Sequence, residues 1–174
     1  VAFLLDSKNS VSTVNRKIST LRSYFKYLIS LSIIKNNPIT KLIAPKTNKK
    51  IPSHISQIDM SKILDESNFT EDFIGKRNFL IIELLYLTGV RVSELLSIRT
   101  KDFDLRNKSI KIIGKGKKER FIPLADVLVK RIQNFVQQFN VTEFLFTNEK
   151  NKKLYSKKIY RIVRDHLSKY STKT

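Results

Sequence analysis

Two cations in this sequence have the residue type and setting for phosphate chemistry, and Arg91 is the first. It follows Thr88-Gly89, where an apolar helical run is expected to end because glycine readily adopts the left-handed conformation that stops a helix. At the start of the next helical turn, unpaired backbone N–H groups already favour an anion. A planar guanidinium there matches two phosphate oxygens at once. The sequence therefore predicts an anion site at Arg91.

Two further side chains are placed to work with Arg91. Glu94 lies three residues later, on the same helical face, where its carboxylate could hold the arginine side chain. Lys115 lies in a glycine-flanked turn between two expected strands, so its mobile ammonium could reach into a groove or donate a proton. Taken alone, an arginine beside a glycine and a lysine-rich turn are more often ordinary surface features.

Two motifs resemble one family of enzymes. The run TGVRVSEL over residues 88–95 resembles the first conserved box of the tyrosine recombinases, above all the Xer-type and phage-integrase group. The run GKGKKERFIP over residues 114–123 resembles the β-hairpin of that family, including its closing Ile-Pro. The order and separation of the two motifs agree with the family, and the resemblance extends over most of the chain.

The resemblance implies a chemistry for these residues. Family members attack DNA with a tyrosine, without a metal or other cofactor, and form a 3′-phosphotyrosyl link that conserves the bond energy. By this likeness Arg91 is the first catalytic arginine, Lys115 protonates the leaving oxygen, and Glu94 has a supporting role. Contacts to DNA phosphates or grooves are expected from the remaining hairpin cations, Lys117, Lys118 and Arg120. The implied partner is double-stranded DNA, on which the full-length protein would form a homo- or hetero-tetramer.

The remainder of the family's catalytic set is not found. Its second box has the form His-x-x-Arg-His, which does not occur in the 174 residues. His166 lacks an arginine three residues later and is interpreted as a surface helix residue. Three tyrosines precede the expected place of that box and are not predicted to be the nucleophile: Tyr155, Tyr160, which fits a packing position, and Tyr170.

The chain begins at Val1 and its single methionine is Met60. We therefore expect a piece of a longer protein, cut before the second box, that does not cleave or rejoin DNA by itself. We also expect an apolar face that the rest of the catalytic domain would cover.

Composition supports a polyanionic partner. Lys and Arg number 34 against 15 Asp and Glu, which gives a net charge of +19. The sequence has 41% hydrophobic residues, as in a globular protein, and no cysteine, which excludes disulfides and fits a reducing cytoplasm. No apolar run approaches the roughly 18 residues of a membrane span. The abundance of lysine, isoleucine and asparagine hints at an AT-rich bacterial genome.

Periodicity predicts a mainly helical, α+β chain with a small antiparallel sheet. Residues 1–45 resemble the last part of a helical core-binding domain, 46–53 are interpreted as a linker, and 54–174 as the N-terminal half of the catalytic domain.

In the first domain a helix is expected from a cap at Ser12 or Thr13 to about residue 32, with a buried stripe of Val14, Ile18, Leu21, Phe25 and Leu28. Its exposed basic face could follow a DNA backbone, although a merely solvated face fits equally well: Arg16, Lys17, Arg22 and Lys26. A short helix is expected to open at Asn37-Pro38.

In the second domain, helices are expected at residues 56–66, 72–88, 125–138 and 152–169, with Val127, Ile132 and Phe135 marking the third. A hairpin is expected from residues 109–113 and 120–123, after a sheet region that begins at 102–104. Two alternatives remain: an inactive DNA-binding remnant or regulator of the same fold, and a generic basic RNA- or ribosome-binding protein.

Overall fold

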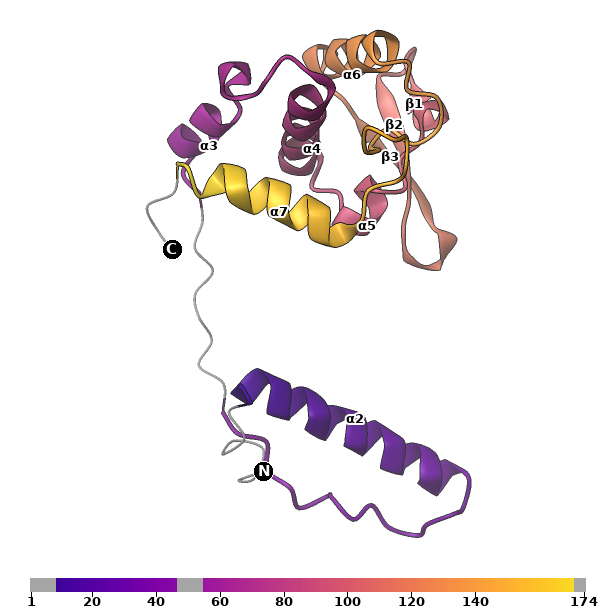
Figure 1. Cartoon of the computed structure of the whole chain (residues 1–174). Coiled ribbons are helices and arrows are strands. Elements are labelled where there is room, and N and C mark those ends of the chain that lie inside the picture. Colours follow the sequence, from indigo (N-terminus) through magenta and orange to yellow (C-terminus); the bar gives the residue numbers. More distant parts are fainter. Residues whose placement is uncertain (1–8, 47–54, 171–174) are drawn as a thin grey trace. The chain divides into compact units, whose positions relative to one another are not determined.

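The computed structural model describes residues 9–46 and 55–170, apart from the side chain of Lys115 (Figure 1). The chain divides into two compact units, Val1–Pro52 and Ser53–Thr174. The division falls within the segment interpreted as a linker, of which residues 47–54 lie outside the described part. Within the described ranges, no helix is both long enough and apolar enough to cross a membrane.

The first unit contains one long helix, α2 (Val11–Ser30). Its N-cap is Ser10, whose hydroxyl accepts a hydrogen bond from the Thr13 N–H at 3.2 Å. The predicted cap at Ser12 or Thr13 was therefore wrong, because the extended backbone that an N-cap requires occurs at Ser10. Of the predicted stripe, Val14 and Ile18 are buried, whereas Leu21 is 44% exposed.

The predicted short helix at Asn37-Pro38 is also absent from the structure, where residues 38–41 form turns. The Asn37 side-chain oxygen accepts the N–H of Ile39 at 3.0 Å, and the Thr40 hydroxyl donates to the Asn37 carbonyl at 2.7 Å. Local side-chain bonds of this kind compete with helix formation and close a turn instead.

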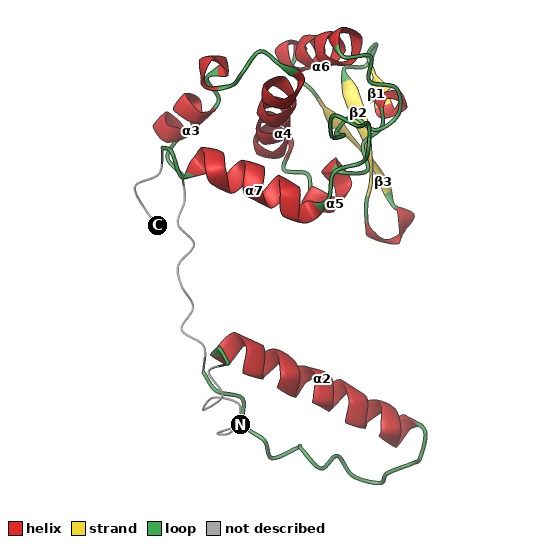
Figure 2. Ribbon diagram, viewed as in Figure 1, coloured by secondary structure: helices red, strands yellow, loops and turns green. Residues whose placement is uncertain are grey.

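The second unit combines several helices with a small sheet, as Figure 2 shows. This confirms the prediction of a mainly helical fold with a small antiparallel sheet. In chain order its elements are α3 (Gln57–Ile63), η1 (Glu66–Asn68), α4 (Phe73–Thr88), α5 (Val92–Leu95), η2 (Thr100–Asp102), β1 (Phe103–Asp104), β2 (Ser109–Ile113), η3 (Lys115–Lys117), β3 (Glu119–Pro123), α6 (Asp126–Gln138) and α7 (Ser156–Leu167).

Helix α4 is the centre of this unit and contacts α5, α6 and α7 (Figure 1). Its N-cap Asp72 accepts the Gly75 N–H at 2.8 Å. A Cβ at Gly75 would lie 1.9 Å from the Thr70 carbonyl oxygen, so the first turn tolerates only glycine there. The helix ends at Gly89, which has φ 61°, as predicted. Five of its apolar side chains are buried in the core: Phe79, Leu80, Ile81, Ile82 and Leu84.

Strand register decides which hairpin side chains face the helices. In the order β1-β2-β3 every pairing is antiparallel, and Ile110 lies opposite Ile122 while Ile112 lies opposite Arg120. Ile110 and Ile112 are buried in the core. Residues directly opposite one another share a face of the sheet. Arg120 is therefore on the same face as Ile112.

Three predicted details of the second unit differ from the structure. Helix α3 ends at Ile63, three residues early, and α7 begins at Ser156 because Lys153 is bridged to Thr147. In α6, Val127 is 58% exposed, since the buried stripe runs through Leu128, Ile132 and Phe135 at helical spacing.

Replacing Gly89 by Ala should lower the free energy of unfolding by about 1 kcal/mol, because a Cβ is strained at positive φ although nothing else crowds the site. Urea unfolding of the chain would measure this. Gly89→Asn is the matched control, since asparagine tolerates the left-handed region, and an equal loss in both variants would contradict the explanation.

Candidate active site

Arg91 lies at the junction between α4 and α5. The chain leaves α4 at Gly89 and passes Val90, which is buried, and Arg91 then has the extended backbone of an N-cap with φ −69° and ψ 151°. The Arg91 side chain is 74% exposed. A buried neighbour thus holds the backbone in place while the guanidinium faces solvent.

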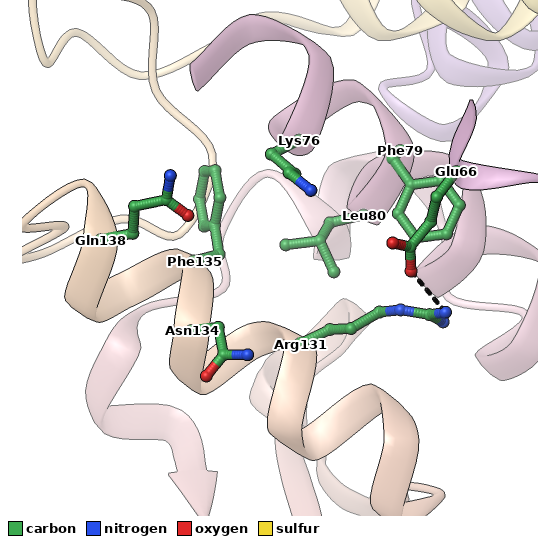
Figure 3. Close-up of a pocket in the computed structure, with 8 residues that line it drawn as sticks. All are labelled: Glu66, Lys76, Phe79, Leu80, Arg131, Asn134, Phe135 and Gln138. Carbon is green, nitrogen blue, oxygen red and sulfur yellow. Dashed lines mark ion pairs between the residues drawn. The ribbon is translucent and has the colours of Figure 1, made fainter. Parts of the chain in front are cut away.

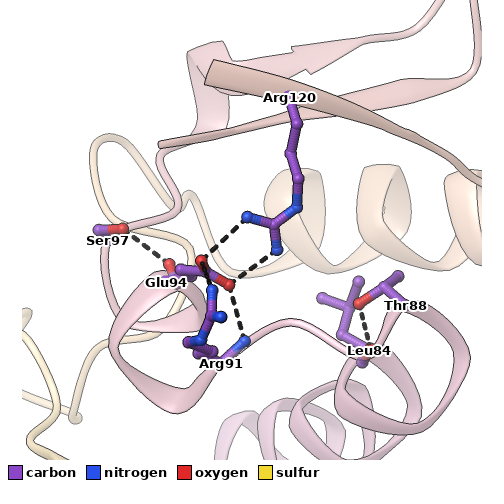
Figure 4. A network of polar contacts seen from close by, with 6 residues as sticks. All are labelled: Leu84, Thr88, Arg91, Glu94, Ser97 and Arg120. Carbon is purple, nitrogen blue, oxygen red and sulfur yellow. Dashed lines mark hydrogen bonds and ion pairs between the residues drawn. The ribbon is translucent and has the colours of Figure 1, made fainter. Parts of the chain in front are cut away.

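Glu94 is the buried residue to which the two arginines of this site bind. Its side chain is only 4% exposed, and Figure 4 shows two guanidinium groups pointing at its carboxylate. Arg91 donates from its side-chain Nη1 to Oε1 at 3.1 Å and from its backbone N–H to Oε2 at 2.8 Å. The predicted support of Arg91 by Glu94 matches this geometry.

The second guanidinium belongs to Arg120 on β3. Its Nη1 and Nη2 donate to Oε1 and Oε2 of Glu94 at 2.9 and 2.8 Å. Arg120 was predicted from the sequence to contact a phosphate or groove of the DNA, and its pairing with Glu94 was not expected. The register of β2 and β3, which puts Arg120 opposite the buried Ile112, is what brings it to Glu94.

These bonds explain the acidity of the carboxyl. The Arg120 side chain, and then the backbone and side chain of Arg91, lower the pKa of Glu94 to about 2, against burial, which raises it. Glu94 is thus ionised throughout the neutral range.

The predicted hairpin forms, with η3 at its tip. Gly116 and Lys117 there have positive φ, and Lys117 and Lys118 are exposed, as a groove contact requires. The side chain of Lys115 lies outside the described part of the structure, so its catalytic role stays a prediction. The preceding residue is close to the cluster, since a Cβ on Gly114 would lie 3.4 Å from Oε1 of Glu94.

The basic residues of α2 are not equivalent. Arg16, Lys17 and Lys26 are exposed, and Lys17 donates to the Asn9 side chain at 3.4 Å. Arg22 is half-buried, contrary to its predicted place on the exposed face, because it donates to the Leu42 carbonyl at 2.7 Å. This bond joins α2 to the segment that follows it, so Arg22 has a structural contact within its unit.

His166 and Tyr160 have settings that differ from their predicted ones. His166 is half-buried: its ring stacks on Phe69 with centroids 4.6 Å apart, and Nδ1 lies 2.8 Å from the Ile162 carbonyl. It is a packing residue and not a surface one. Tyr160, expected to pack, is 64% exposed, whereas Tyr170 lies against the core.

A second polar cluster lies between η1, α4 and α6. Arg131 pairs with Glu66 at 2.5 Å and with the buried Glu83, and its guanidinium lies 5.0 Å from the centre of the Phe79 ring. Burial raises the pKa of Glu83 although Arg131 opposes it. Figure 3 shows Arg131 reaching toward Glu66 across a small cavity. The cluster ties three elements together, and no sequence pattern indicated it.

The described residues include no group of three or more His, Cys, Asp or Glu side chains that could hold a metal ion. The arrangement at Glu94 offers cationic N–H donors, which stabilise negative charge on a phosphate.

Comparison with known proteins identifies the family. The sequence model of the Phage integrase family matches residues 53–173. Tyrosine recombinase XerC of Staphylococcus epidermidis is 37% identical over 139 residues, which cover 80% of this chain and 47% of the relative. Tyrosine recombinase XerC of Oceanobacillus iheyensis is 32% identical over 169 residues, covering 92% of this chain and 55% of the relative. The chain belongs to the phage integrase family. The resemblance drawn from residues 88–95 and 114–123 is thereby confirmed.

Solved structures agree with this membership. The XerH recombinase bound to its palindromic difH substrate, in a post-cleavage complex, is 26% identical with a TM-score of 0.61, over 71% of this chain and 37% of XerH. A lambda integrase dimer bound to a COC′ core site has a TM-score of 0.72 at 18% identity, over 96% of this chain and 47% of that one, and shows the shared fold. This phage integrase family chain spans about half the length of the curated relatives quoted above.

Glu94 should make the stability of the chain depend on pH. Its pKa is lowered from an ordinary 4.5 to about 2 in the folded state, so the stabilisation is fully present above pH 4.5 and is lost as pH falls toward 2. Between pH 6 and pH 3, urea unfolding should show a loss of about 2 kcal/mol from this group. Glu94→Gln should be less stable at pH 6 and should lack this part of the pH dependence. An equal pH dependence in both proteins would contradict the assignment.

Proposed function

We propose that this chain is part of a site-specific DNA recombinase, which cleaves and rejoins strands through a 3′-phosphotyrosyl intermediate. The observation that carries the proposal is Arg91, exposed to solvent yet held by the buried Glu94 within the family's first box. The family membership and the similarity to proteins named tyrosine recombinase XerC support it.

Arg91 would stabilise the transition state. Attack on a phosphodiester concentrates negative charge on the non-bridging oxygens, and preset N–H donors lower that barrier. Within the described part of the structure, Nη1 is the one nitrogen of the Arg91 guanidinium that makes a hydrogen bond. The other N–H groups are left for a phosphate. Because Glu94 already fixes the side chain, little ordering is needed when DNA binds.

Lys115 would complete the proton transfers of the cleavage step. The leaving 5′-oxygen needs a proton as the phosphotyrosyl bond forms, and an ammonium on a hairpin tip that starts beside the Glu94 cluster could supply it. We propose that the attacking tyrosine and the second box lie outside this chain. The mechanism needs a His-x-x-Arg-His motif, and this motif does not occur in the 174 residues.

The proposed partner is double-stranded DNA, held by exposed cations of both units: Arg16, Lys17, Lys26, Lys117 and Lys118. A net charge of +19 supports a polyanionic partner. Relatives solved on DNA, such as XerH on difH, support duplex DNA over RNA. We propose further that the full-length protein acts as a tetramer on DNA, in the cytoplasm of a bacterium.

A second candidate function is a DNA-binding remnant or regulator of the same fold. The exposed cations of the described residues would serve such a binding role without strand cleavage.

Arg91→Ala in the full-length protein separates these functions. We expect covalent cleavage of a nicked suicide substrate to fall about 100-fold or more, because one preset donor is lost. DNA affinity should change little, since one of many phosphate contacts is removed. Lys130→Ala, which removes an exposed charge from α6, is the control. Equal cleavage by both variants would exclude the catalytic role of Arg91.

The 174-residue chain alone should bind duplex DNA without forming a covalent adduct. Binding should weaken steeply with salt because bound cations release counterions from the DNA. Titrations against duplex DNA and a structured RNA of equal length would measure it. Tighter binding to RNA would favour the generic RNA-binding alternative, and an adduct would show that the nucleophile is within the chain.

A further inference from the structure

Arg120 is bound to Glu94 more completely than Arg91 is. Both terminal nitrogens of Arg120 contact the carboxylate, at 2.9 and 2.8 Å, whereas the Arg91 side chain makes one contact at 3.1 Å. Bidentate pairs of this kind combine strength with a fixed geometry. The Arg120 guanidinium thus has its planar fork directed at a side chain of the protein (Figure 4).

The four N–H donors fill the acceptor positions of Glu94. Oε1 accepts from Arg120 and from the Arg91 side chain, while Oε2 accepts from Arg120 and from the Arg91 backbone. A carboxylate has about four lone-pair sites, so this one is saturated. The Arg91 guanidinium consequently cannot close a bidentate pair on Glu94 while Arg120 is bound.

The same contact joins the two elements that hold the candidate catalytic cations. Glu94 lies in α5, which begins directly after Arg91, and Arg120 lies on β3, the strand that leaves the Lys115 turn. Arg120 is paired with Ile112 across the hairpin, so its position follows that of β2 as well. A shift of the hairpin relative to α5 would break both bonds to the buried carboxylate.

We propose that Arg120 is a positioning residue for DNA strand cleavage: it occupies Glu94 so that the Arg91 guanidinium stays available to phosphate, and it fixes the Lys115 hairpin beside α5. The inference rests on the proposed function. It replaces the interpretation of Arg120 as a groove contact, because the fork is already used within the protein.

The first test compares Arg120→Gln, Arg120→Lys and Lys130→Gln in the full-length protein. Lys130 is an exposed cation of α6 to which no DNA contact is assigned, and it serves as the control. Single-turnover cleavage of a suicide substrate should fall at least about 10-fold in both Arg120 variants, with DNA affinity nearly unchanged. Lysine should not rescue, because it keeps the charge but cannot form the bidentate pair. Lys130→Gln should leave both the DNA affinity and the cleavage rate nearly unchanged.

A double-mutant cycle with Glu94→Gln tests whether Arg120 acts through Glu94. Residues in one contact network give non-additive effects. Arg120→Gln should therefore add little to the loss of cleavage caused by Glu94→Gln. Additive losses, or full rescue by Arg120→Lys, would overturn the inference and return Arg120 to the DNA contacts.

NMR titration of the Glu94 carboxyl in the 174-residue chain provides a readout independent of activity. The pKa of Glu94 should rise from about 2 toward its ordinary value in Arg120→Gln and stay unchanged in Lys130→Gln. An unchanged value in Arg120→Gln would overturn the contact itself. Absence of any adduct with the wild-type full-length protein would overturn the proposed function, and this inference with it. An adduct that forms equally fast in Arg120→Gln would overturn only the inference.

Discussion

A buried carboxylate that accepts four N–H bonds is the interaction on which the rest of the site depends. Glu94 is almost inaccessible to solvent, and a charge in that position is tolerated only when it is paired and hydrogen-bonded. Arg91 and Arg120 meet this requirement together. Removing either partner would leave part of a buried charge unsatisfied, so the geometry of one cation is tied to the presence of the other.

The hydrophobic core holds this carboxylate in place. Helix α5 is too short to be stable alone, and it is anchored by Leu95, which is fully buried, and by contact with α4 and α7. Helix α4 is in turn fixed at both ends, by Asp72 at its start and by Gly89 at its end. The exposed Arg91 is therefore carried between two packed helices, which suits the proposed role of meeting a phosphate without reorganising.

Predictions from local pattern succeeded where one interaction dominates. The end of α4 at Gly89 and the presence of the β2–β3 hairpin follow from glycine and alternation rules. They failed where two local signals compete. The Asn37 side chain closes a turn in place of a helix, and in α6 the stripe begins at Leu128 and leaves Val127 in solvent. His166 was misplaced because its packing partner, Phe69, lies far away in the chain.

The sequence by itself determined the family, the mainly helical class and the pairing of Arg91 with Glu94, because these depend on residues within a few positions of one another. Only the tertiary structure decided that Arg120, 26 residues from Glu94, saturates the same carboxylate. The same holds for Arg77, which donates to the Thr147 carbonyl 70 residues away, and for Arg131 at Glu83. The reason is physical: helical and strand periodicity place near neighbours, whereas contacts between distant cations and acids depend on how strands register and helices pack.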